Sequence, residues 1–141
     1  MTLERRIAAR PQTVFSFFTD RDKWLSWMGA DGSFTFEPGG AYTTNVTGDN
    51  QAAGTFVEID PYRRVVFTWG WEHGGMPDVP PGSTTVTIDL EPDQDGTLLR
   101  LTHTGLPTPE ACKAHEEGWQ HYTQRLATRA RGGDPGPDAW L

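Results

Sequence analysis

The side chain best suited to acid–base chemistry is His103, which shares one face of a predicted strand with Leu99 and Leu101. An imidazole in such an apolar interior can donate one hydrogen bond and accept another, so it could orient a carbonyl or hydroxyl ligand or act as a general acid or base. A buried histidine is also commonly satisfied by a backbone group, and that alternative stays open. Glu58 is the candidate carboxylate partner, but strand parity does not decide which way it points. We therefore assign no catalytic set, and His103 and Glu58 are the only candidates.

The aromatic side chains predict a different kind of site, a pocket for a small apolar molecule. Residues 65, 67, 69 and 71 lie on one face of a predicted strand, and three of these four are aromatic. Rigid ring faces with a few N–H and O–H groups at their edges are typical of small-molecule sites, although the same rings also fill ordinary cores. The predicted ligand-binding residues are Trp27, Phe34, Tyr42, Phe56, Trp69, Trp71, His103, Gly118, Trp119 and Tyr122.

Two glycine-containing features bear on the same pocket. Gly118 lies inside a predicted long helix, where glycine costs roughly 1 kcal/mol relative to alanine. Either tight packing of its neighbours against a strand or the close approach of a ligand could compensate. The segment from Glu72 to Gly82 contains three prolines and three glycines, and we expect either a lid beside the pocket mouth or a connector without ligand contact.

Other chemistries lack the residue patterns that they require. No two of the four histidines stand at the i, i+4 spacing of a helical metal site, and the single cysteine, Cys112, excludes a thiolate cluster and an internal disulfide. There is no Gly-x-Ser-x-Gly elbow and no glycine-rich phosphate or dinucleotide loop. We therefore expect neither a metal nor another cofactor.

The composition of the chain restricts the classes of partner that it is expected to bind. The 141 residues include 19 acidic and 12 basic side chains, and the resulting net charge of −7 would repel a phosphate backbone, so no nucleic acid is expected. There is no charged-then-apolar leader and no apolar stretch near 18 residues, which predicts no membrane span and a cytoplasmic location.

The elements that must position these residues predict one α+β domain. A first strand from Thr2 to Ala9 is followed by two short helices, one after Pro11 and one capped at Thr19 or Asp20. Six further strands with short connections follow, which permits antiparallel but not parallel neighbours, so we expect a seven-stranded antiparallel sheet. A long helix from Thr108 to about Arg131 should cover the apolar face of that sheet. The predicted domain is residues 1–131, and residues 132–141 are predicted to be a flexible polar tail.

The order of the elements and several sequence motifs resemble the SRPBCC superfamily of START-like and birch-pollen-allergen-like domains. Within it, the chain is most similar to the branch named for the activator of heat-shock-protein-90 ATPase homologues. The motifs are Trp24 with Trp27, Glu37-Pro38-Gly39-Gly40, Gly54 to Pro61, Val65 to Trp69, Gly96-Thr97, Thr102 to Pro107 and His115 to Trp119. The resemblance implies a helix-grip fold, a curved sheet around the C-terminal helix, with a cavity between them that binds hydrophobic ligands. It does not imply one chemistry.

Three functions follow from the residues and the resemblance together. The first is binding of a small hydrophobic or aromatic molecule in an internal cavity. The second is an enzyme, cyclase- or hydrolase-like, that acts on the bound molecule through His103. The third is an interaction protein similar to chaperone-ATPase activators, with a role in the stress response. A homodimer is compatible with all three, because two-fold interfaces of small domains carry no sequence motif.

Overall fold

The computed structural model describes all 141 residues and contains eight strands and three helices. In chain order they are β1 (Thr2–Ile7), α1 (Pro11–Ser16), α2 (Arg21–Leu25), β2 (Asp31–Phe34), β3 (Ala41–Thr47), β4 (Asn50–Asp60), β5 (Arg64–Trp69), β6 (Trp71–His73), β7 (Thr84–Asp93), β8 (Gly96–Thr104) and α3 (Pro109–Ala130). No helix has both the length and the hydropathy needed to cross a bilayer.

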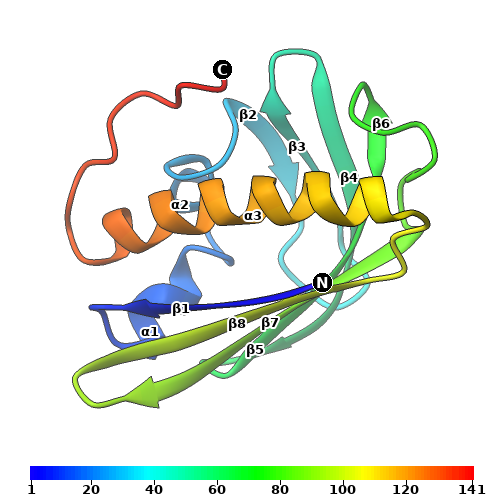
Figure 1. Ribbon diagram of the computed structural model, residues 1–141. Helices are drawn as coiled ribbons and strands as arrows, with labels where there is room; N and C mark the ends of the chain where they lie inside the picture. Colours follow the sequence, from blue (N-terminus) through cyan, green and yellow to red (C-terminus); the bar gives the residue numbers. More distant parts are fainter.

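The strands form one antiparallel sheet in the order β1-β8-β7-β5-β4-β3-β2, and β6 pairs with β4 beside this path. The sheet is curved, and α3 passes between its two wings, with β1, β8, β7 and β5 on one side and β2, β3, β4 and β6 on the other (Figure 1). Because β4 pairs with β5 through its second half and with β3 and β6 through its first half, this long strand joins the wings. The predicted helix-grip α+β fold is confirmed.

The eighth strand arises because the predicted strand through Trp71 is broken at Gly70. A Cβ at Gly70 would overlap the carbonyl oxygen of Pro80, so a loop residue occupies the place that a side chain would need. Beyond this glycine, the Trp71 amide donates to the carbonyl oxygen of Val79 at 2.7 Å, and β6 turns to pair with β4 instead of β7. The prediction of one continuous strand was wrong, because the approach of residues ten positions later is not visible in a local pattern.

Helix α3 has the caps that its sequence predicts. The Thr108 hydroxyl oxygen accepts a hydrogen bond from the Ala111 amide at 3.0 Å, and Pro109 occupies the first turn, where no backbone donor is needed. The helix ends at Ala130, and Gly132 follows with a φ of +90°, a conformation that glycine adopts without strain. The expected helix is confirmed to within one residue at each end.

A cluster of aromatic rings fills the core where α1 and α2 meet the sheet. Trp24 is its centre: the side chain is fully buried, and six other rings have centroids between 5.0 and 6.5 Å from its own. These rings belong to Phe18, Trp27, Phe34, Tyr42, Phe56 and Phe67. Edge-to-face and tilted packing of this kind leaves the rings in contact with one another and closes this end of the interior.

Candidate functional site

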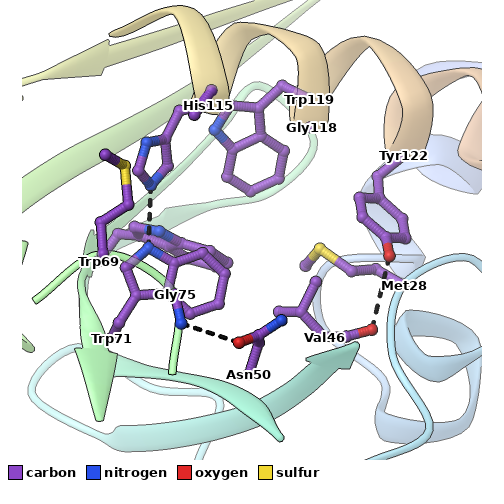
Figure 2. A pocket seen from close by; sticks show the side chains of 12 residues that line it. Met28, Val46, Asn50, Trp69, Trp71, Gly75, His115, Gly118, Trp119 and Tyr122 are labelled. Carbon is purple, nitrogen blue, oxygen red and sulfur yellow. Dashed lines mark hydrogen bonds between the residues drawn. The ribbon is translucent and has the colours of Figure 1, made fainter. Parts of the chain in front are cut away.

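A pocket of about 230 Å³ lies between α3 and the wing of the sheet that contains β3, β4 and β6. Figure 2 shows indole rings rising from the strands and facing the side chains that descend from α3. The lining residues are Met28, Val46, Asn50, Trp69, Trp71, Gly75, Met76, Ala114, His115, Gly118, Trp119 and Tyr122. No charged side chain is among them.

His115 joins the helix to the sheet across one end of the pocket. Its Nδ1 donates to the carbonyl oxygen of Ala111 at 2.8 Å, within α3, so Nε2 is left as an acceptor. The Trp71 Nε1–H donates to this His115 Nε2 at 3.1 Å (Figure 2). Burial lowers the pKa of His115, outweighing the opposing effects of the Ala111 carbonyl and of Asp78. The imidazole is therefore neutral at ordinary pH and has both nitrogens engaged.

His103 lies behind the pocket wall and is held in the same way. The Trp119 Nε1–H donates to His103 Nδ1 at 3.0 Å, and Nε2–H donates to the Thr84 hydroxyl oxygen at 2.8 Å. That hydroxyl donates in turn to the Trp69 carbonyl oxygen at 2.7 Å. Burial, followed by the nearby His115 and the N-terminal amine, lowers the pKa of His103 to about 3. The chain of hydrogen bonds is complete, so His103 fixes the Trp119 ring and has no nitrogen free for a ligand.

Tyr122 forms the opposite end of the pocket and is anchored by the C-terminal segment. Its hydroxyl donates to Asp138 at 2.8 Å and lies 3.5 Å from the Val46 carbonyl oxygen. The Asp138 side chain is only 3% exposed and also accepts from His121 Nε2 at 2.8 Å. Burial alone would raise the pKa of Asp138, but the hydrogen bonds from the Trp140 amide, His121 and Tyr122 lower it. Residues 134–141, which belong to the predicted flexible tail at 132–141, thus lie against α3 and support one wall.

The loop after β6 contributes a third edge. Gly75 and Met76 line the pocket, and both belong to the segment predicted as a lid or a connector. The Gly75 amide donates to Asn50 Oδ1 at 2.8 Å (Figure 2). Asn50 Nδ2 donates to the Thr47 hydroxyl oxygen at 2.7 Å. Asn50 therefore ties the loop to the start of β4 beside the pocket mouth.

Gly118 lines the pocket and has open space where a side chain would project. A Cβ built at this position has no neighbour within 4 Å outside the helix's own backbone. Gly118 itself is therefore not pressed against a strand, although its neighbour Trp119 packs on the Trp69 ring of β5 at a centroid distance of 5.1 Å. The glycine instead leaves the helix surface free where it faces the pocket.

The structure divides the ten predicted ligand-binding residues into two groups. Trp69, Trp71, Gly118, Trp119 and Tyr122 line the pocket together. The other five lie away from it: His103 lies behind Trp119, and Trp27, Phe34, Tyr42 and Phe56 belong to the ring cluster around Trp24. Alternation along a strand selects inward residues correctly, but it does not say which end of the interior they reach.

The candidate acid–base pair is separated by the sheet. Glu58 is exposed among Asp60, Arg64 and Arg100 on the outer face, whereas His103 is buried on the inner face. The register of β4 shifts between Phe56 and Glu58, which is why parity along the strand could not place this carboxylate. The two side chains cannot act together, and no group of three or more potential metal ligands converges anywhere in the chain.

Seven lining residues are absent from the predicted ligand-binding set, although Gly75 and Met76 lie in the segment predicted as a lid or a connector. The seven are Met28, Val46, Asn50, Gly75, Met76, Ala114 and His115. Two of them carried a usable signal, because Ala114 and His115 precede Gly118 and Trp119 by one helical turn and so share their face. The others come from strand ends and loops, whose position depends on the whole sheet.

A curved antiparallel sheet around a long C-terminal helix, with an aromatic pocket between them, defines a helix-grip protein. Residues 8–131 match the family described as "Activator of Hsp90 ATPase homolog 1-like protein", and the chain belongs to this family. No curated protein matches the sequence significantly.

Solved structures agree with this assignment. An AHSA1-like protein from Rhizobium etli is 48% identical with a TM-score of 0.78, over all of this chain and 87% of that one. A protein from Rhizobium loti is 30% identical with a TM-score of 0.75, over 90% of this chain and 93% of that one. The Aha1 dimer from Colwellia psychrerythraea shares the fold at 22% identity, with a TM-score of 0.77 over 94% and 96% of the two chains.

Proposed function

We propose that this protein binds a small hydrophobic or aromatic molecule in the pocket between α3 and the sheet. The observation that carries the proposal is the composition of the wall: three indoles, one phenol and two thioethers surround the open space at Gly118, and no charged side chain is present. Broad apolar faces with few polar groups are the usual construction of a small-molecule site.

The size and the stiffness of the wall support a compact ligand. The volume of about 230 Å³ is below the roughly 300–1,000 Å³ of pockets for drug-sized molecules, so one or two fused rings fit best. Hydrogen bonds hold the rings of Trp71 and Trp119 before any ligand arrives, which reduces the entropy lost on binding. Met28 and Met76 are flexible and polarisable, and they can adjust to the shape of a guest.

Binding is better supported than turnover. A general acid or base must reach the substrate with a nitrogen or oxygen that can exchange a proton. His115 is the only titratable imidazole on the wall, and its two nitrogens are occupied by Ala111 and Trp71. His103, the candidate base, is occupied by Trp119 and Thr84 and does not line the pocket.

Native mass spectrometry of the gently purified protein, followed by calorimetric titration with the bicyclic hydrocarbon tetralin, tests the proposal. Trp71→Ala should weaken tetralin binding at least tenfold, since it removes a buried ring face worth roughly 1.5–3 kcal/mol. Tyr62→Ala is the matched control, because Tyr62 is 50% exposed and packs on Phe15 outside the pocket. No bound molecule in the spectrum and no heat with tetralin would refute the proposed function.

A chaperone-activator role is a separate proposal that rests on the family description. A structure described as an HSP90 activator from Plasmodium falciparum is 20% identical to this chain, which shows a common fold alone. A binding assay with purified Hsp90 and this chain tests that role directly, and it is independent of the pocket.

A further inference from the structure

One residue of the pocket wall, Trp69, carries a buried side-chain polar group without a hydrogen-bond partner, its Nε1–H. This atom is buried, and the whole residue is only 2% exposed. The ring lines the pocket beside Trp71 and Trp119, at centroid distances of 5.4 and 5.1 Å (Figure 2). A buried donor left unpaired costs roughly 1–3 kcal/mol, so its presence on the wall requires an explanation.

The other ring N–H and hydroxyl donors on this wall already have acceptors. The indole N–H groups of Trp71 and Trp119 donate to imidazoles, and the Tyr122 hydroxyl donates to a carboxylate. Asn50, which is half-buried, donates one of its two amide hydrogens to a threonine hydroxyl, and His115 donates from Nδ1 to a backbone carbonyl. The Trp69 N–H is therefore the one fully buried side-chain donor among the lining residues that has no partner.

Two other buried polar atoms lack partners, and neither lies on the pocket. They are Trp24 Nε1 and Thr44 Oγ1, and neither residue contributes to the lining. Trp24 is fully buried at the centre of the ring cluster, where no ligand can reach it. It provides an internal comparison, since it carries the same unpaired group in a closed environment.

The absence of charged side chains in the pocket lining also restricts the charge of the ligand. The lining has no lysine, arginine, aspartate or glutamate, and the one imidazole is occupied on both sides. An ionised ligand would lose its hydration without gaining a counter-charge, which is strongly unfavourable. A cationic ligand would be attracted by the π electrons of the indole faces, but it would also lie close to the positive end of the Trp69 N–H dipole, which repels it.

We propose that the natural ligand is a neutral molecule of one or two fused rings that carries a hydrogen-bond acceptor, such as a carbonyl oxygen, and that the Trp69 Nε1–H binds this acceptor. The inference rests on the proposed function and adds the chemical class of the ligand. Ring stacking supplies affinity, and the buried Trp69 donor selects the orientation of the bound molecule.

A matched pair of probes separates the two contributions. Tetralin and 1-tetralone have the same fused-ring frame, but only 1-tetralone has an acceptor oxygen. One neutral hydrogen bond contributes about 0.5–1.5 kcal/mol, so the wild-type protein should bind 1-tetralone roughly three- to tenfold more tightly in calorimetric titrations. Trp69→Phe keeps a ring and removes the donor, so it should abolish this preference. Trp24→Phe removes the unpaired donor of the core and should leave the preference unchanged.

Nuclear magnetic resonance of the wild-type protein makes the test independent of how well the variants fold. The Trp69 indole N–H proton should move downfield on addition of 1-tetralone and not of tetralin, while the Trp24 resonance stays in place. Equal affinity for both probes, a preference retained in Trp69→Phe, or tighter binding of phenyltrimethylammonium would overturn the inference and leave the proposed function standing. Absence of binding by all three probes, together with no bound molecule in the native mass spectrum, would refute both.

Discussion

The clearest prediction concerns Gly118, a half-buried position of α3 at which a mutation to a larger residue is expected to stabilise the protein. Replacing this glycine with alanine should stabilise the protein, because alanine is preferred over glycine by about 1 kcal/mol in a helix interior. No steric cost offsets the gain, since the added Cβ meets no atom within 4 Å beyond the helix's own backbone. For a chain of this length the gain corresponds to a rise in Tm of about 3–4 °C.

The assay is thermal denaturation followed by circular dichroism, together with urea titration at a fixed temperature. Gly54→Ala is the control, because a Cβ at Gly54 would overlap the carbonyl oxygen of Thr68 and should destabilise the protein. A lower Tm for Gly118→Ala would show that α3 packs closely at this turn, and the open space inferred above would not exist.

A larger side chain at the same position connects stability to function. Gly118→Leu places a branched side chain in the pocket, so tetralin affinity should fall at least tenfold. The helix should still form, because leucine has a higher helix propensity than glycine. Comparison with Gly118→Ala separates loss of space from loss of fold. Unchanged tetralin affinity in Gly118→Leu would place the binding site elsewhere.

Two further predictions follow from buried titratable groups. The pKa of His103 is about 3 in the folded state and about 6.5 in the unfolded chain. Between these two values the unfolded chain binds a proton that the folded protein does not bind. The free energy of unfolding should therefore fall by about 2 kcal/mol from pH 7.5 to pH 5.0. The stability that neutral His103 contributes is fully present above about pH 6.5 and is lost as the pH falls below that value. Urea titrations at several pH values should show that His103→Asn lacks this loss of stability. An identical pH dependence in both proteins would contradict the prediction. Asp138→Asn replaces an acceptor of the Tyr122 hydroxyl and the His121 ring with a weaker one, and should cost about 1–3 kcal/mol and shift Trp140 emission to the red. Unchanged stability and emission would mean that the C-terminal segment is not attached in solution.

Much of the fold was predictable because its signals are local. The N-cap at Thr108 and the glycine at position 132 mark the ends of α3 by chemistry within one turn. The alternation around Val65 and Phe67 marks inward residues of β5, and both are fully buried. Strand ends were less certain. β4 begins at Asn50, four residues before the Gly54 to Pro61 motif, because its first residues pair with both β3 and β6.

The site was predictable only in part, for a geometric reason. Trp69 and Trp119 were selected by the periods of their own elements, and both line the pocket. Periodicity alone could not distinguish them from Phe56, which points into the same interior but belongs to the ring cluster. It also could not separate the roles of the two histidines that receive indole hydrogen bonds, His103 behind the wall and His115 on it.

The sequence by itself determined which residues form each helix and most strands, which side chains face the interior, and the family to which the chain belongs. Only the tertiary structure decided where the interior is filled and where it stays open, that Glu58 and His103 lie on opposite faces, and that the Trp69 N–H remains unpaired. The reason is that caps and side-chain periods are set by neighbours within a few residues, whereas the distance between Gly118 and the strands depends on the curvature of the whole sheet and on side chains far apart in the chain.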